Sequence, residues 1–372
     1  MKSNLNRRQL LQTGIGLATV AGAGSHRVQA GAAAQNPTTV RFPERIRVGI
    51  IGFEGHLSEI LNATRSVPQV QITAIADDRE EVQGRIRGNP LLQQARLYRD
   101  YRELIEREKL DIVAVFGENG PRASIIRDCA SLKVPIVAEK PLALTLEELE
   151  SVRSAIVSAS VPLTVLLPMR FDPQYRRMRS IVTSGEIGEV VMMAAQKSYK
   201  LGSRPSWMKE RAKFGGTIPY IGIHMVDLML FVGGRDFKSV AAFHSQVGFP
   251  EMREMENNAV LAFQLDNRGT ASLRLDYLRP QTAPTHGDDR LRIAGTKGII
   301  EYQESRPLTL MTGEVSPKSV TDLPAPKMLF VDFLESIYGN TTHALSFEEI
   351  YRVNEIVLKA REAADRGQVI RL

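Results

Sequence analysis

The chain has 372 residues, with 48 Lys and Arg against 42 Asp and Glu, for a formal net charge of +6. That length exceeds one simple core and predicts two domains. Lys2, Arg7, Arg8 and Arg27 lie in the first 30 residues, which hold no acid, so removing these four charges from +6 leaves +2. The remaining basic residues are interspersed with acids, which excludes a nucleic-acid-binding function. A single cysteine, Cys129, excludes an intramolecular disulfide and is expected in the core.

The N-terminus has the layout of a secretory signal. Arg7 and Arg8 precede an apolar, glycine-rich stretch over residues 10–24 and a small-x-small cleavage site at 28–30. The stretch is too short and glycine-rich to be a stable membrane span. No span is expected in the mature chain either. We expect a twin-arginine signal peptide over 1–30, a linker over 31–43, and export to the periplasm or the medium. A tail with chance arginines is the alternative.

Residues 44–168 alternate short apolar runs with amphipathic segments. Strands are predicted at 45–51, 70–76, 111–116, 134–138 and 163–167, and helices at 57–67, 101–107, 121–132 and 145–158. Thr145 and Glu148 form a capping-box pattern at the start of the last of these helices. This alternation predicts an α/β domain with a doubly wound parallel sheet.

The rhythm changes after residue 168. A helix is predicted at 173–184, followed by long alternating segments at 190–199, 239–247, 258–265, 269–277, 290–294 and 298–302. Only residues 216–231, which end in a predicted helix, interrupt this series of strands. The pattern predicts an α+β domain over 169–345, built on one antiparallel sheet. An amphipathic helix at 347–366 dominates the C-terminal segment, 346–372.

The first strand and its turn occupy the position of a dinucleotide-binding fingerprint. Gly52 ends the strand, and Asp77 follows 25 residues later at the end of the second strand. A carboxylate there bonds a ribose hydroxyl and repels a 2′-phosphate, which favours NAD over NADP. The fingerprint is incomplete, because Glu54 and Leu57 occupy its second and third glycine positions, although Gly55 offers a shifted turn. A plain strand-to-helix turn is the alternative.

A second candidate site follows the strand at 134–138. Pro141 ends this run, so Glu139 and Lys140 are held at the carboxyl end of a buried strand. Open α/β sheets bind their ligands at that edge. The alternative is a surface ion pair before a turn.

Several motifs occur together in a fixed order. They are Val48-Gly49-Ile50-Ile51-Gly52, Asn119, Glu139-Lys140-Pro141, Arg170-Phe171-Asp172-Pro173, Ser184-Gly185-Glu186-Ile187-Gly188, Gly215-Gly216, Gly222-Ile223-His224 with Asp227, and Gly295-Thr296-Lys297-Gly298. With them the chain, from residue 45 to the C-terminus, resembles the glucose–fructose oxidoreductase, inositol dehydrogenase and rhizopine-catabolism (Gfo/Idh/MocA) family. The resemblance implies an N-terminal Rossmann domain and a C-terminal domain built on a large, mostly antiparallel open sheet. It implies NAD(P)-dependent oxidation or reduction of sugar or polyol hydroxyls. It also implies a homo-oligomer formed through the C-terminal sheet.

The resemblance assigns roles to several residues. Lys140 would stabilise negative charge on the reacting oxygen, between nicotinamide and substrate. Glu139 and Asn119 would lie near the cofactor. His224 falls on the family's histidine, and its imidazole suits transfer of the hydroxyl proton. A histidine satisfied in a domain interface is the alternative for His224.

The main departure from the family is Tyr220, where an aspartate usually stands four residues before the histidine. Either Lys140 lowers the pKa of the Tyr220 phenol and the two do acid–base work, or Tyr220 shapes the sugar pocket and the proton relay is lost. Arg170, Tyr175, Asp227 and His286 are candidates for the substrate side. Arg170 is equally consistent with a structural role, as an arginine that closes the junction between the two domains. No metal site is expected.

Three functions remain open from the sequence. The first is an NAD-dependent sugar or polyol oxidoreductase. The second is a redox-neutral enzyme that processes glycosides with tightly bound NAD, through transient oxidation and elimination. The third is a non-catalytic sugar-binding protein on an eroded dehydrogenase fold, which Glu54, Leu57 and Tyr220 favour.

Overall fold

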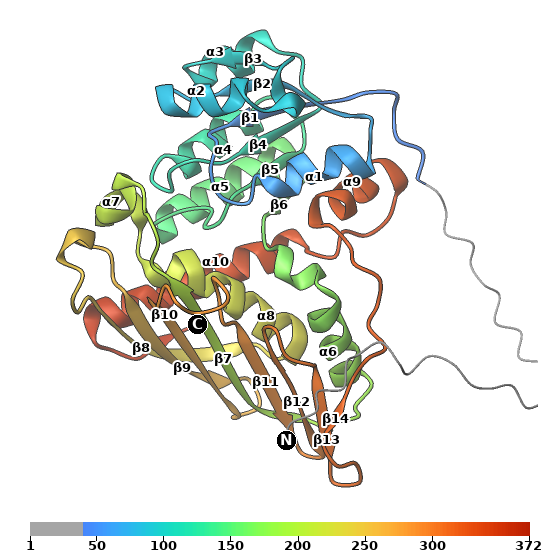
Figure 1. The fold of residues 1–372 in the computed structure, drawn as a ribbon, viewed down its shortest axis with the longest axis vertical. Helices are drawn as coiled ribbons and strands as arrows, with labels where there is room; N and C mark the ends of the chain where they lie inside the picture. The colour runs from blue at the N-terminus through green and yellow to red at the C-terminus, as the bar shows by residue number, and fades with distance from the viewer. Residues whose placement is uncertain (1–39) are drawn as a thin grey trace, which may run out of the picture. The chain divides into compact units, whose positions relative to one another are not determined.

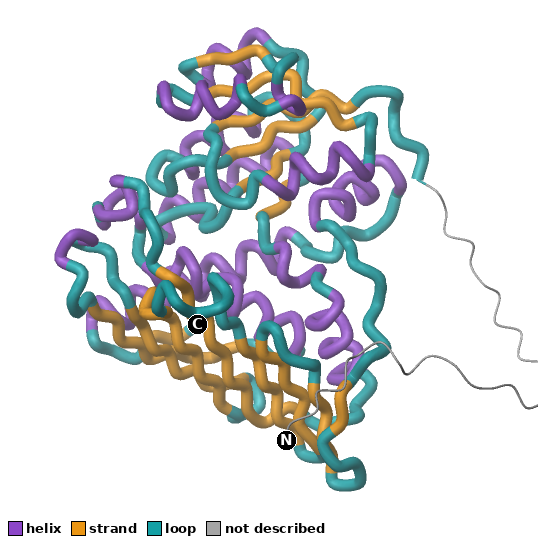
Figure 2. Tube along the Cα trace, viewed as in Figure 1, coloured by secondary structure: helices purple, strands orange, loops and turns teal. Residues whose placement is uncertain are grey.

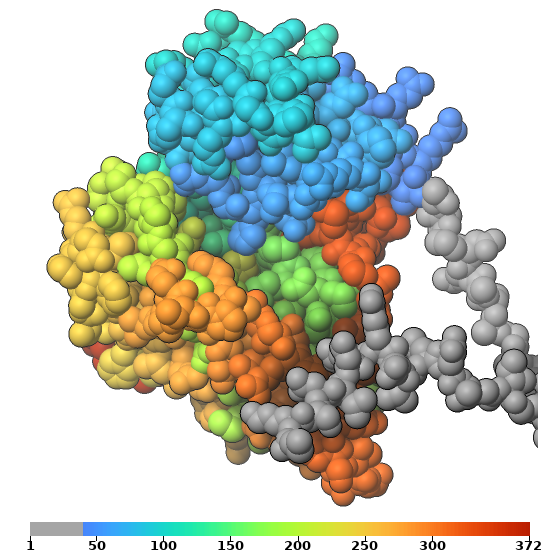
Figure 3. Space-filling model, in the orientation of Figure 1, coloured from blue at the N-terminus to red at the C-terminus, as the bar shows by residue number. Residues whose placement is uncertain are grey.

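The computed structural model describes residues 40–372, so the predicted signal peptide and most of the predicted linker lie outside the described residues. Residues 40–372 hold two β-sheets, one of six strands and one of nine (Figure 1). The first is parallel and the second mostly antiparallel, which confirms the predicted fold class. In Figure 3 the blue and cyan atoms around the first sheet meet the green and orange atoms around the second.

The first sheet has the strand order β3-β2-β1-β4-β5-β6. Its strands are β1 (Ile46–Ile51), β2 (Val70–Ala76), β3 (Arg96–Tyr98), β4 (Ile112–Val115), β5 (Ile136–Ala138) and β6 (Leu163–Val165). Because β1 pairs with both β2 and β4, the strand order reverses there, and open α/β sheets bind ligands beside such a reversal. The three-residue strand β3 was not predicted, because Arg-Leu-Tyr is too short to show an apolar alternation.

Helices flank the first sheet. They are α1 (Ser58–Ser66), α2 (Glu80–Arg87), α3 (Tyr101–Arg107), α4 (Arg122–Ala130) and α5 (Leu146–Ala159). The predicted capping box is present, since the Thr145 hydroxyl accepts from the Glu148 amide while the Glu148 carboxylate accepts from the Thr145 amide. Cys129 on α4 is buried, as expected. A later helix, α9 (Leu329–Gly339), packs against α1. The chain therefore returns to the first domain within the range expected for the second.

The second sheet has the order β14-β13-β12-β11-β7-β10-β9-β8-β15. Its strands are β7 (Val190–Lys200), β8 (Phe237–Ser245), β9 (Asn258–Leu265), β10 (Thr270–Arg279), β11 (Arg290–Gly295), β12 (Gly298–Gln303), β13 (Thr309–Thr312), β14 (Lys318–Ser319) and β15 (Ile370–Arg371). Only β7 and β10 pair in parallel. The helices α6 (Pro173–Thr183), α8 (Ile223–Gly233) and α10 (Phe347–Arg366) cover one face, and Figure 2 shows the strands in orange beneath them.

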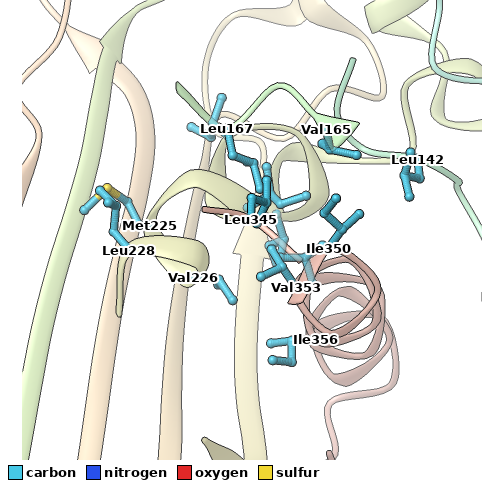
Figure 4. Close-up of a cluster of buried hydrophobic side chains, with 14 of the residues drawn as sticks. Leu142, Val165, Leu167, Met225, Val226, Leu228, Leu345, Ile350, Val353 and Ile356 are labelled. Carbon is cyan, nitrogen blue, oxygen red and sulfur yellow. The ribbon is translucent and has the colours of Figure 1, made fainter. Parts of the chain in front are cut away.

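Helix α10 joins the second domain to the segment that follows Lys140. Figure 4 shows Leu142 in the same buried cluster as Ile350 and Val353, which lie on α10. The buried side-chain oxygen Oδ1 of Asn354 accepts from the Leu142 amide at 2.9 Å. This helix therefore holds the loop that carries Lys140 at a defined place against the second domain.

Among residues 40–372, one helical stretch, 211–233, is long and apolar enough to cross a membrane, and most of it is buried inside the protein. It comprises α7 (Arg211–Phe214), a π-helical turn η4 (Ile218–Gly222) and α8. The π-helical turn places Tyr220 ahead of His224 in a wider coil than an α-helix has.

Candidate active site

The glycine turn after β1 requires its two glycines. Gly52 has φ +78° and Gly55 has φ +72°, a region that other residues rarely adopt. A Cβ on Gly52 would lie 2.7 Å from the Gly117 amide nitrogen, and a Cβ on Gly55 would collide with the Glu139 carboxylate. The close packing of Gly55 on Glu139 links the turn directly to the Glu139-Lys140 segment.

The carboxylate at the second glycine position is neutralised rather than bare. Glu54 forms an ion pair with Arg79, which follows β2, and its Oε2 accepts from Trp207 Nε1 at 3.2 Å. Asp77 also binds Arg79, through hydrogen bonds of 2.9 Å to Nε and 2.7 Å to Nη2. One guanidinium therefore compensates both acids at this edge of the sheet.

A cleft of about 620 Å³ opens beside these residues, at the carboxyl ends of β1, β2 and β4. Residues along it include Gly52, Asp77, Arg79, Tyr101, Gly117 and Glu118. The glycine turn permits close backbone approach, and Asp77 stands where the ribose acid is needed, so the residues present fit a dinucleotide. Asn119, predicted near the cofactor, is buried and bonds Arg122 and the Phe214 carbonyl.

Removing the ribose acid should change cofactor preference. In Asp77→Ala, Arg79 loses a carboxylate partner and becomes available to a 2′-phosphate. We expect the ratio of NADPH to NADH affinity to rise at least about tenfold, because a hydrogen bond to a charged group contributes roughly 1.5–3 kcal/mol. Calorimetric titration with both cofactors measures this ratio. Asp78→Ala is the control, and an equal shift in that variant would show a general charge effect instead.

Glu139 is a buried carboxylate with several donors around it. Its Oε1 accepts from the amide of His56 at 2.7 Å and from His56 Nδ1 at 2.6 Å, and its Oε2 accepts from the Lys140 amide at 2.7 Å. Burial opposes its ionisation, but His56, Lys140 and Arg122 outweigh burial and lower the pKa of Glu139 to about 2. Glu139 is therefore ionised at neutral pH and can only accept hydrogen bonds.

Lys140 lies beneath the ring of Tyr220. Its Nζ donates to the Tyr220 carbonyl at 3.0 Å and lies 3.7 Å from the ring centroid. Burial lowers the pKa of Lys140 to about 8, whereas burial and Glu139 raise the pKa of Tyr220 to about 12. The hypothesis that Lys140 lowers the pKa of the Tyr220 phenol is therefore wrong, because burial disfavours the phenolate and the ammonium faces the ring. The Tyr220 ring packs edge-on against Trp207 and Phe214.

A pocket of about 250 Å³ lies next to the glycine turn. His56 enters it from the turn after β1, His224 from α8 and Lys197 from β7. The other lining residues are Met169, Asp172, Tyr175, Tyr199, Asp289, Tyr302 and Glu304. The structure thus brings together two predicted site residues, His224 and Tyr175.

His224 is buried without a compensating acceptor. Its Nδ1 has no hydrogen-bond partner among the described residues, and its side chain is 4% exposed. Burial, Lys197, Lys140 and His56 lower the pKa of His224 well below its usual value. The imidazole is therefore neutral at neutral pH, which suits hydrogen bonding to a hydroxyl.

Sequence reasoning missed most of the polar lining of the pocket. Lys197 is buried and donates to Asp289 Oδ2 at 2.6 Å. Asp172, which precedes α6, has its pKa raised to about 6 by burial, with Glu59 adding to the effect. Lys197 occupies an inward position of β7, and a lysine there within a mostly apolar strand is the signal that could have identified it.

The remaining predicted substrate residues lie elsewhere. Arg170 and Asp227 form a buried ion pair, and Arg170 also binds Glu349 at 2.8 Å and the Ala344 carbonyl at 3.1 Å. These contacts agree with the alternative stated for Arg170, a structural arginine that closes a junction. His286 is exposed, and its ring centroid lies 5.0 Å from that of Tyr199. Among the described residues, His286 is not one of those that line the pocket. Residues 40–372 contain no group of three or more His, Cys, Asp or Glu side chains placed to hold a metal ion.

Comparison with known proteins places the chain in a family. Residues 46–167 match the oxidoreductase family with an NAD-binding Rossmann fold, and residues 175–301 match the GFO/IDH/MocA C-terminal domain. The uncharacterized oxidoreductase YrbE of Bacillus subtilis is 26% identical over 87% of this chain and 90% of its own. The myo-inositol 2-dehydrogenase of Thermotoga maritima is 24% identical over 72% of this chain and 78% of its own.

Solved structures agree with this placement. An oxidoreductase-like protein from Thermotoga maritima superposes with a TM-score of 0.82 at 34% identity, over 88% of this chain and all of that one. The two matched domains together span more than half of the sequence, and the parallel sheet with its glycine turn is the part that matches the NAD-binding fold. The chain therefore belongs to the Gfo/Idh/MocA family of NAD-binding oxidoreductases.

Proposed function

We propose that the protein is an NAD-dependent oxidoreductase acting on a hydroxyl carbon of a sugar or polyol. The observation that carries the proposal is the pocket that adjoins the glycine turn and is lined by His56, His224 and Lys197. Polar side chains from several elements converge on a volume suited to a small molecule. Hydroxyl-rich compounds match such a lining, because each hydroxyl can both donate and accept hydrogen bonds.

Each part of the site has a role in this proposal. The turn at Gly52 and Gly55 lets the backbone approach the pyrophosphate, and Asp77 binds the ribose. When bound, the nicotinamide exchanges a hydride with the substrate carbon. Lys140, which is close enough to His224 to lower its pKa, stabilises the negative charge that develops on the reacting oxygen. Neutral His224 forms a hydrogen bond to the same hydroxyl and orients it.

Cofactor binding and turnover test the proposal together. We expect calorimetry of the purified protein without residues 1–30 to show NADH binding. We also expect absorbance at the reduced-nicotinamide band to rise when NAD⁺ is mixed with one of three probes, myo-inositol, D-glucose or D-xylose. Absence of both signals would reject the proposal and leave the non-catalytic sugar-binding protein as the better explanation.

The redox-neutral alternative has one observation in its favour. Glu54 connects the glycine turn to the buried Trp207 of the second domain, a contact that would oppose cofactor release. An enzyme that retains its cofactor can oxidise and re-reduce within one cycle. Co-purified NAD, cleavage of 4-nitrophenyl β-D-glucoside and no net NADH would select this alternative. Glu54→Gly is then expected to release the cofactor on gel filtration.

We propose further that the protein is exported by the twin-arginine pathway to the periplasm or the medium. Arg7, Arg8 and the apolar stretch behind them support this. Replacing both arginines by lysine is expected to leave the precursor in the cytoplasmic fraction. Export unchanged by this replacement would exclude the pathway.

A homo-oligomer through the second sheet is also proposed. Its uncovered face carries the exposed apolar side chains Phe243, Val260 and Leu278, on neighbouring strands β8, β9 and β10. Apolar side chains clustered on an open face are typical of an interface. We expect light scattering to show an oligomer and Phe243→Glu to weaken it. A monomer at micromolar concentration would reject the proposal.

A further inference from the structure

Two imidazoles meet in the pocket, and their surroundings differ. The ring of His56 meets that of His224 edge to face, with 5.2 Å between centroids. His56 is bonded to Glu139 through both its amide and Nδ1. His224 has no carboxylate partner among residues 40–372, and its Nδ1 is buried and unpartnered. The two rings are therefore suited to different tasks.

The contact with Glu139 selects one tautomer of His56. Glu139 is a carboxylate, which accepts hydrogen bonds and donates none, so the proton of the 2.6 Å contact must be on Nδ1 of His56. The lone pair of neutral His56 is then on Nε2. A carboxylate that holds Nδ1–H orients an imidazole and stabilises the imidazolium formed when Nε2 takes a proton, as in hydrolase triads.

His224 lacks this support. A proton on His224 would lie close to Lys197 and Lys140, in a buried position where desolvation also disfavours charge. The groups that face His56 include Glu139 from the end of β5, Glu59 from α1 and His224 from α8. Two of these three are carboxylates. A proton on the His56 ring would therefore have a carboxylate partner, whereas His224 has none among residues 40–372.

We infer that His56, oriented by Glu139, exchanges the proton of the substrate hydroxyl. Position 220, where the family usually has an aspartate, is a tyrosine in this chain. On oxidation the O–H bond breaks and its proton goes to Nε2 of His56, while its electron pair becomes the second bond of the carbonyl. The hydride leaves the same carbon for the oxidised nicotinamide that the proposed function supplies. His224 then binds the hydroxyl without ionising, and Glu139 is a positioning residue.

This inference deepens the proposed function and rests on it. Its test compares His56→Ala, Glu139→Gln and the control His244→Gln, on β8 outside the pocket, using the fastest of myo-inositol, D-glucose and D-xylose as probe. We expect His56→Ala to keep its NADH affinity within about threefold and to lose turnover by about 10²–10⁴. Added imidazole should restore part of the loss, which a structural role would not permit.

Ring ¹⁵N shifts give a readout that is independent of activity. We expect His56 to show the Nδ1–H tautomer in the wild-type protein and to lose this preference in Glu139→Gln, with the shifts of His244 unchanged. Three results would overturn this inference while leaving the proposed function in place. They are full turnover in His56→Ala, a loss of turnover that imidazole does not rescue, and an Nε2–H tautomer of His56 in the wild type. No NADH binding and no turnover by the wild-type protein would reject the proposed function as well.

Discussion

Lys140→Met is expected to lower turnover by about 10²–10³, the effect of removing one preorganised donor from a developing oxyanion. The ammonium is buried at the end of β5 and needs no reorganisation to act there. NADH affinity should change little, because the role assigned to Lys140 arises in the transition state. Single-turnover hydride transfer and calorimetry measure the two effects separately.

Most substitutions of buried residues lower the free energy of unfolding, but Lys140→Met is not expected to do so. Burial lowers the pKa of Lys140 from 10.5 to about 8, so the charged side chain opposes folding below about pH 8. That cost decreases as the pH rises from about 8 to 10.5, because above 10.5 Lys140 is neutral in both the folded and the unfolded protein. We therefore expect Lys140→Met to be no less stable than the wild type at pH 7. An inactive but unfolded variant would remove the evidence for a catalytic role.

The same ionisation predicts a pH dependence. Lys140 carries its charge below its pKa of about 8, so turnover of the wild type should fall as the pH rises through that value. Lys140→Arg is the comparison, because a guanidinium stays charged over the whole range and its residual activity should lack this alkaline limb. A limb that persists in Lys140→Arg would assign it to another group.

Asp227→Ala is expected to destabilise the protein by about 3–5 kcal/mol, because it leaves the Arg170 guanidinium buried without its main partner. Both side chains are about 1% exposed, so solvent cannot replace the lost carboxylate. Thermal and urea unfolding measure the change. Glu349 stays bonded to Arg170 but is partly exposed, and it compensates only in part.

A paired replacement separates structure from substrate binding at this position. Arg170→Met with Asp227→Leu removes both charges at similar volume, and such exchanges are often neutral or stabilising. We expect the double variant to recover most of the stability and to keep turnover. A stable double variant without turnover would restore the substrate role that the sequence suggested for Asp227.

The amino-acid sequence by itself determined the features that depend on neighbouring residues. The alternation of apolar runs predicted both sheets, and Thr145 with Glu148 predicted the cap of α5. Gly52 and Asp77 were identified because a strand, a glycine turn and a later acid form a local pattern. Helix α2 was missed, because its polar composition and Gly84 weaken the helical signal.

The tertiary structure alone decided which side chains meet. His56 lies one residue after Gly55 and had no evident role until the fold brought Glu139, 83 residues later, to its ring. Lys197 and Asp289, separated by 92 residues, likewise meet only because β7 and the residue before β11 face one pocket. Sequence periodicity encodes which face of an element is buried, but contacts between distant residues depend on the order of the strands in each sheet and on how the loops at their ends pack. For that reason the glycine turn could be predicted, whereas the proton-transfer group beside it required the structure.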